Sequence, residues 1–147
     1  MDIVRRNTDY ALRAMVNLAR NYNKVLISSR TISAQEKVPY QLACKLMQKL
    51  HKAKLIKSSM GPRGGFQLSR EPAKITLLQI IEAIQESLSL NRCLLIKSTC
   101  PKMKTCTIRP KLVELQESIG NYLTNITLAE LVENNKKDVE FENRKGD

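Results

Sequence analysis

The chain has 147 residues, a formal net charge of +11, 42% apolar and 4% aromatic residues, and no tryptophan. This length suits a small domain with an oligomerisation arm, and the aliphatic composition favours helices. The basic excess indicates a polyanionic partner, because neutralised phosphates release counterions. The sequence lacks both a membrane-spanning apolar run and the apolar core of a signal peptide, so we expect a cytoplasmic protein that does not bind membranes.

Helical periodicity runs through residues 8–52. We expect Thr8 to cap a first helix of about four turns, whose apolar stripe consists of Ala11, Ala14, Met15, Leu18 and Tyr22. A short second helix is predicted over residues 30–36. A third is predicted over residues 39–52, because Pro39 suits a first helical turn, where its missing N–H leaves no bond unmade.

A β-hairpin is predicted directly after these helices. Residues 55–59 and 66–69 contain apolar side chains, and the sequence Gly61-Pro62-Arg63-Gly64-Gly65 between them is typical of a tight turn. Three helices followed by a hairpin is the element order of a winged helix-turn-helix.

The C-terminal half predicts further helices and an interface. Thr76 and Gln79 form a capping-box pattern before an amphipathic helix, and Thr127 and Glu130 form a second one. Pro110 is expected to open the last long helix. Its apolar residues recur three and four positions apart, as in a coiled-coil seam: Leu112, Leu115, Ile119, Tyr122 and Ile126. This seam either joins two copies of the chain or packs on its own domain, and we favour dimerisation.

The predicted fold is mainly α, a winged helix-turn-helix DNA-binding domain with a long C-terminal dimerisation helix. Residues 1–75 are assigned to the DNA-binding domain. Residues 76–133 are assigned to a cysteine-bearing sensor loop and dimerisation helices, and the polar residues 134–147 to a disordered tail.

The third predicted helix is expected to enter the major groove of double-stranded DNA. Gln41 can pair with adenine, and the lysines of this helix can reach phosphates. In the hairpin turn, Arg63 can enter the minor groove and glycine lets the backbone approach DNA closely. The predicted DNA contacts are Tyr40, Gln41, Lys45, Lys49, Arg63 and Gly64.

Three cysteines gather between the predicted helices of the C-terminal half. Cys93, Cys100 and Cys106 are spaced C-x6-C-x5-C, without the tight pairs of most zinc sites. Such wide spacing beside lysines can wrap an iron–sulfur cluster held by thiolates, but on the residues alone free or redox-active thiols fit equally well. Cys44 stands alone in the third predicted helix and is expected to be a small helix residue, not a ligand.

Several motifs distributed along the chain occur together. Thr8-Asp9-Tyr10-Ala11-Leu12-Arg13 opens the first predicted helix, Val38-Pro39-Tyr40 opens the third, and Gly61-Pro62-Arg63-Gly64-Gly65-Phe66 forms the hairpin turn. The three cysteines and the closing segment 125–131 complete the set. In combination they resemble the IscR/NsrR family of bacterial transcription regulators, also called the Rrf-two family, over nearly the whole chain.

The resemblance implies a homodimer that holds a 2Fe–2S or 4Fe–4S iron–sulfur cluster through Cys93, Cys100, Cys106 and a fourth ligand. IscR-like members have a histidine where this chain has Arg109, which cannot bind a metal. NsrR-like members use an aspartate of the partner subunit, and Asp9 matches that position. The alternative role of Asp9 is to interact with the helix dipole.

The sequence thus predicts a DNA-binding transcription regulator, expected to be a repressor, that is controlled by an iron–sulfur cluster. One alternative is a cluster-free member of the family that responds through thiol chemistry or a partner enzyme of cysteine metabolism. A different class is an iron–sulfur carrier or scaffold, which has no use for a wing or for a charge of +11. No catalytic set of residues stands out, so we do not expect an enzyme.

Overall fold

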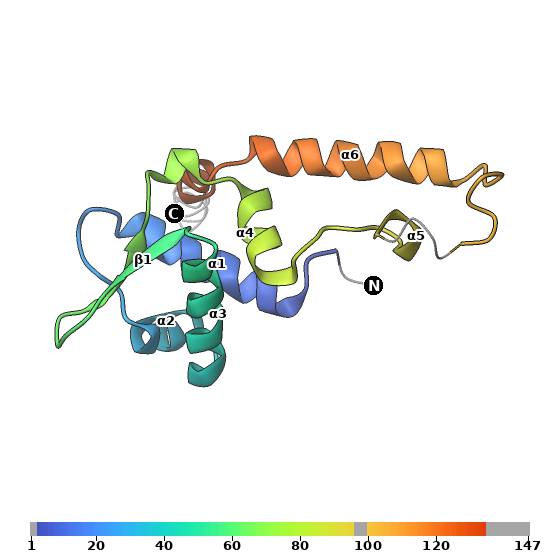
Figure 1. Cartoon of the computed structure of the whole chain (residues 1–147). Helices are drawn as coiled ribbons and strands as arrows, with labels where there is room; N and C mark the ends of the chain where they lie inside the picture. The colour runs from blue at the N-terminus through green and yellow to red at the C-terminus, as the bar shows by residue number, and fades with distance from the viewer. Residues whose placement is uncertain (1–2, 96–99, 135–147) are drawn as a thin grey trace, which may run out of the picture.

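The computed structural model describes residues 3–95 and 100–134 and is dominated by helices. Its N-terminal body contains α1 (Arg6–Arg20), α2 (Ser29–Glu36) and α3 (Tyr40–Lys52) (Figure 1). α2 and α3 pack against each other, and both contact α1. Ala11, Ala14, Met15 and Leu18 of the apolar stripe predicted for the first helix are buried, in the same core as Met47 and Leu50 of α3. Tyr22, the last residue of that stripe, lies in the turn after α1 and is only partly buried.

An antiparallel hairpin, the wing, follows α3. β1 (Ile56–Ser59) pairs with β2 (Gly65–Leu68). Ile27 extends the pairing, because its backbone exchanges two hydrogen bonds with Phe66, 2.9 and 2.8 Å long. Gly65 permits this approach, since a Cβ at that position would lie 2.9 Å from the carbonyl of Ile27. The base of the wing is thus tied to the body, while its tip projects beyond it (Figure 1).

The helix α4 (Leu77–Gln85) follows a 3-10 turn at Pro72–Lys74. The capping box predicted for it is confirmed: the Gln79 N–H donates to Thr76 Oγ1 at 3.2 Å, and the Thr76 N–H donates to Gln79 Oε1 at 3.0 Å. Ile80 and Ile84 are buried in the same core as the first three helices, and α4 packs against α1 and α3. The C-terminal end of α4 is therefore the point where the chain leaves the body toward the cysteines.

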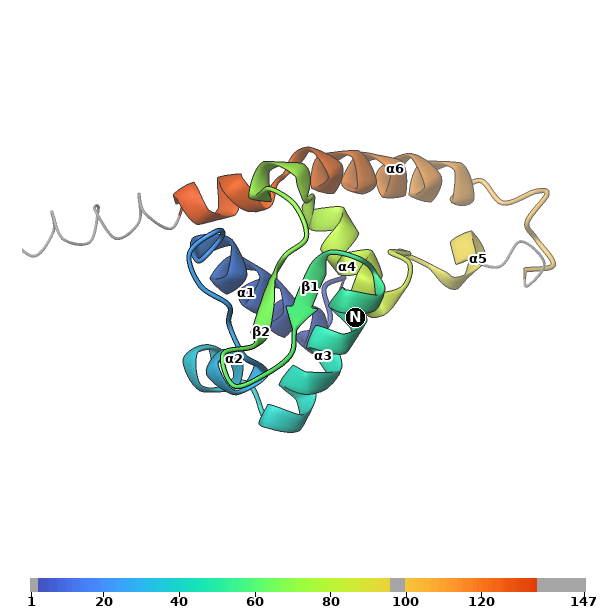
Figure 2. The same ribbon diagram turned by 60° about the vertical axis from the view of Figure 1, so that its left-hand side comes forward.

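Beyond α4 the chain extends outward and returns in one long helix. α5 (Arg92–Leu95) lies alongside the N-terminal end of α6 (Arg109–Asn125), and α6 crosses one end of the body (Figures 1 and 2). Backbone bonds fix the other end of α6: the Leu77 N–H donates to the Ile126 carbonyl at 2.9 Å, and the Leu128 N–H donates to the Ile75 carbonyl at 3.0 Å. Residues 128–134 form a final helix.

The predicted fold class is confirmed: a mainly helical chain with a winged helix-turn-helix and a long C-terminal helix. The expected cap was wrong. α1 begins at Arg6, and Thr8 is fully buried, with its hydroxyl donating to Gln85 Oε1 at 2.8 Å. Packing against α4, not local capping, therefore explains this threonine.

Most of the predicted tail, residues 135–147, lies outside the described residues. Within residues 3–95 and 100–134, no helix is both long enough and apolar enough to cross a membrane.

Candidate DNA-binding face and cysteine pocket

The exposed side of α3 is polar and basic. Ala43, Leu46, Met47 and Leu50 face the core. Helical spacing places Gln41, Lys45, Gln48 and Lys52 on the opposite side, and all four are exposed. A helix with this free side has the dimensions that the major groove of B-DNA admits.

Lys49 lies one helical turn beyond Lys45, at the edge of the exposed side that is nearest to α4. Its Nζ donates a hydrogen bond to the carbonyl of Ile84 in the last turn of α4, at 3.2 Å. A cation at that place satisfies a terminal carbonyl and interacts favourably with the helix dipole. Lys49 thus has a contact inside the body, and the phosphate contact expected of it stays a prediction.

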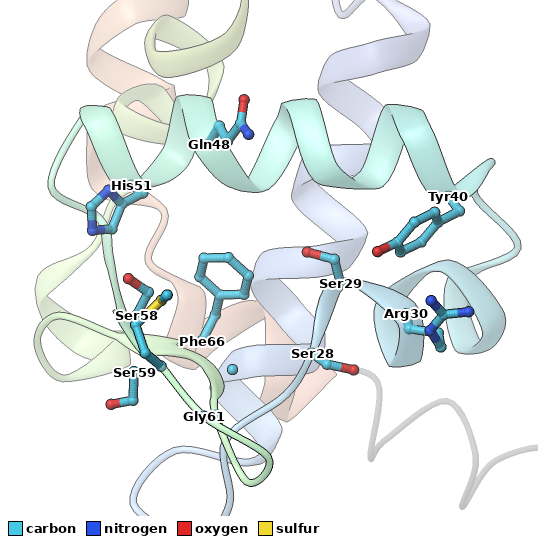
Figure 3. Close-up of a pocket in the computed structure, with 13 residues that line it drawn as sticks. Ser28, Ser29, Arg30, Tyr40, Gln48, His51, Ser58, Ser59, Gly61 and Phe66 are labelled. Carbon is cyan, nitrogen blue, oxygen red and sulfur yellow. The ribbon is translucent and has the colours of Figure 1, made fainter.

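A groove of about 580 Å³, the wing groove, opens between α3, the start of α2 and the wing. Figure 3 shows Tyr40 and Arg30 at one end, where the Arg30 guanidinium lies over the Tyr40 ring at 4.9 Å. His51, Ser58 and Ser59 stand at the other end. The walls therefore offer hydroxyl, imidazole and guanidinium donors, the groups that commonly bind the sugar-phosphate backbone.

The tip of the wing is exposed and includes Arg63. Gly64 shapes the turn behind it: its N–H donates to the Gly61 carbonyl at 2.9 Å, and a Cβ at Gly64 would collide with the carbonyl oxygen of Ser59. Gly64 thus lines the wing groove and shapes its turn, whereas Arg63 is exposed at the tip and does not line the groove.

Only Tyr40 and Gly64 of the wing-groove residues are among the predicted DNA contacts. The polar residues that the prediction missed include Ser28, Ser29, Arg30 and Gln48. Ser28 caps α2, accepting a hydrogen bond from the Thr31 N–H at 3.1 Å. A serine-serine-arginine sequence at a predicted helix start was the available signal, because helix N-termini bind phosphate. The sequence does not show that the wing folds back beside that helix.

Cys93, Cys100 and Cys106 line one pocket of about 520 Å³, the cysteine pocket. Cys93 lies in α5, and the other two lie in the turns that lead into α6. Their thiols are free, as is that of Cys44, which sits half-buried on α3 and does not line the pocket. The fold thus brings the three predicted ligands together and leaves Cys44 apart.

Arg109, the first residue of α6, also lines the cysteine pocket. Its backbone N–H donates to Cys106 Sγ at 3.4 Å. Its side-chain Nε is buried and has no hydrogen-bond partner among the described residues. The position thus carries a cation and a free donor.

Asp9 does not line the cysteine pocket of its own chain. It sits in the first turn of α1, about half exposed, and its Oδ2 pairs with Arg13 at 2.7 Å. Ligation by Asp9 therefore requires a second subunit and stays a prediction.

Three helices, a wing and a polar recognition surface define a winged helix-turn-helix DNA-binding protein of the transcription-regulator class. The profile of the Rrf2 family, described as an iron-dependent transcriptional regulator, matches residues 4–134. The chain belongs to the Rrf2 family, which confirms the resemblance seen in its motifs.

Relatives and solved structures agree with this assignment. The HTH-type transcriptional regulator IscR of Serratia proteamaculans is 32% identical over 125 residues, covering 85% of this chain and 76% of that protein. The structure of T. potens IscR matches with a TM-score of 0.75 at 25% identity, covering 92% of this chain and 89% of its own. The oxidized form of Staphylococcus aureus CymR matches with a TM-score of 0.68 at 26% identity, covering 90% and 97%.

Proposed function

We propose that this Rrf2-family regulator binds operator DNA as a homodimer, acts as a repressor in the cytoplasm, and is switched by an iron–sulfur cluster held by Cys93, Cys100 and Cys106. The observation that carries the cluster is the single pocket lined by all three thiols. The family description as iron-dependent supports the same assignment.

The donor set of the cysteine pocket consists of three thiols, the soft donors that suit iron and sulfide. Among residues 3–95 and 100–134, no three His, Cys, Asp or Glu side chains are grouped so that they could hold a metal ion. The thiols instead border a space of about 520 Å³, with Ile108 and Leu112 among its walls. Thiolates of a cluster bind different iron atoms and therefore stand apart, while apolar walls limit solvent access. When bound, the cluster would supply a group whose loss or change of oxidation state reports iron or oxidant supply.

The end of α4 offers a physical route from this pocket to DNA. Gln85 accepts a hydrogen bond from Thr8 of α1, and Ile84 accepts one from Lys49 of α3. The next residue, Glu86, has φ +69° and turns the chain away from the body toward the cysteines. We infer that cluster binding in the cysteine pocket shifts this joint and, through Lys49, the tilt of α3. Hydrogen-bonded chains of this kind carry coupling between sites.

The DNA contacts are proposed for Gln41 at a base edge in the major groove and for Lys45 at a phosphate, with Tyr40, Lys49, Arg63 and Gly64 supporting further backbone contacts. Gln41→Ala is expected to cost about 1–3 kcal/mol at the preferred site and to relax the base preference there, because a bidentate amide contact is lost. Lys45→Ala is expected to weaken all sequences alike and to lower the log–log salt slope by about 1, because one phosphate contact is lost.

Fluorescence anisotropy on a panel of operator variants, repeated at several salt concentrations, measures both effects. Lys45 is preferred over Lys49 for this comparison because removal of Lys49 also breaks the bond to α4. Equal weakening of every sequence by both variants would show that Gln41 reads no base.

The switch is tested by preparing the protein without oxygen, with and without iron and sulfide. We expect a coloured protein with bound iron and sulfide, and at least a tenfold difference in operator affinity between the loaded and the metal-free form. The operator is first selected from genomic fragments. A coloured protein that binds no fragment in either form would indicate an iron–sulfur carrier instead.

A second candidate is a cluster-free regulator that responds through its thiols. The similarity to the oxidized form of CymR favours this candidate, and so do the free thiols within one pocket. A colourless protein whose DNA affinity changes with peroxide and is restored by a dithiol would establish it and refute the cluster.

A further inference from the structure

The guanidinium of Arg109 has no explanation in the fold of this chain. Its Nε is buried without a hydrogen-bond partner in the described part of the chain, and an unpaired buried donor is costly and rare in native proteins. Within the described residues, the ion pairs are those of Arg13 with Asp9 and of Lys111 with Glu114, and no acidic side chain pairs with Arg109. The packing of α6 therefore does not account for this side chain.

The surroundings of Arg109 indicate which acceptors suit its unpaired donor. The cysteine pocket that it lines contains three thiol sulfurs, which are hydrogen-bond acceptors and carry negative charge when they bind iron. A guanidinium stays protonated in proteins and offers donors only, so Arg109 cannot itself be a ligand. The nearby Lys102 and Lys104 are exposed, and water screens their charge more strongly.

We propose that Arg109 is a positioning residue of the cysteine pocket: its side-chain N–H groups hydrogen-bond to sulfur atoms of the cluster and raise the cluster's reduction potential. The inference rests on the proposed cluster and concerns what this chain does to it. The backbone N–H of Arg109 already donates to Cys106 Sγ at 3.4 Å, and the residue lines the same pocket as all three cysteines.

The expected effect follows from charge. A one-electron reduction adds negative charge to the cluster and its thiolates, and donors and cations near the sulfurs stabilise that charge. Arg109→Met removes the donors and the cation. It is expected to shift the equilibrium at least tenfold toward the oxidised cluster, which is a fall of about 59 mV for a one-electron couple. Arg109→Lys keeps the cation but lacks the Nε donor. Its reduction potential is expected to lie between those of the wild type and Arg109→Met.

The experiment is an anaerobic potentiometric titration of full-length reconstituted protein, with dithionite as the reductant and the visible spectrum as the readout. Lys111→Met is the matched control. It removes one positive charge two residues further along the same helix, from a side chain that is 79% exposed, so its potential is expected to equal that of the wild type.

The measured potentials decide whether Arg109 acts on the cluster. If both Arg109 variants have the reduction potential of the wild type, the role proposed for Arg109 is overturned and the proposed cluster is unaffected. If the wild-type protein assembles no cluster, both the role of Arg109 and the cluster are refuted. If Arg109→Met assembles no cluster, Arg109→Lys decides: a lowered potential supports the proposal, and an unchanged potential overturns it.

Discussion

Replacing any one of Cys93, Cys100 and Cys106 by alanine is expected to abolish the visible chromophore and the bound iron and sulfide. The three thiols are the soft donors of the cysteine pocket, and thiolates are the ligands that iron–sulfur clusters require. With one thiol missing, only two soft donors remain in the pocket. We therefore expect complete loss after anaerobic reconstitution, measured by absorption together with iron and sulfide assays.

The matched control for this prediction is Cys44→Ala. Cys44 has the same chemistry but lies on α3 and does not line the pocket, so spectrum and metal content are expected to equal those of the wild type. Circular dichroism should show unchanged helix content in all four variants, because none of these cysteines is fully buried. A single-cysteine variant of the pocket that retains a full cluster would remove that residue from the ligand set.

Asp9 differs from the three cysteines because it does not line the cysteine pocket of its own chain. Its carboxylate is paired with Arg13, but about half of the side chain is exposed, which leaves it accessible to a second subunit. A carboxylate is a harder donor than a thiolate and holds iron of a sulfur-rich cluster less firmly. If Asp9 is the fourth ligand, the iron that it binds is therefore the most exposed to attack by oxygen or nitric oxide.

The helices and the wing follow from local signals. Apolar spacing places Met15 and Leu18 of α1 in the core, the Thr76 box starts α4, and the glycine-rich turn forms the wing. The start of α1 does not follow, because Thr8 is held by Gln85, 77 positions away in the sequence. Such a contact leaves no periodic pattern near Thr8.

The sites were predictable in residue type and less so in arrangement. The cysteine spacing indicates thiols on a loop. The three cysteines line one pocket with Arg109 only because the chain turns back and continues into α6. In the same way, Lys45 and Lys49 are one helical turn apart on α3 and both are exposed. The sequence cannot tell Lys45 from Lys49 until the end of α4 is placed against one of them.

The outward side of α6 is unusual for a long helix of a single chain. None of its residues is buried, and Leu115 and Tyr122 are 51% and 69% exposed. These two residues and Ile119 fall on one stripe with the spacing of a coiled-coil seam. An amphipathic helix gains most of its stability from packing of its apolar stripe, so we propose that a second copy of α6 covers it.

Changing Leu115 and Tyr122 together to glutamate is therefore expected to convert the proposed dimer into a monomer, because each subunit would bury two charges without partners at the seam. The monomer should lose about 10²–10⁴-fold in affinity for an operator with two half-sites, since the second recognition helix is no longer tethered. Affinity for an isolated half-site should stay unchanged. Sedimentation velocity measures the oligomeric state, and anisotropy measures the operator affinity.

The matched control is Asn121→Glu. It adds a charge at an exposed position of α6 that lies off the stripe, and the variant should remain dimeric. A double variant that sediments as a dimer would place the interface elsewhere, and a wild type that is monomeric at micromolar concentration would refute the homodimer itself.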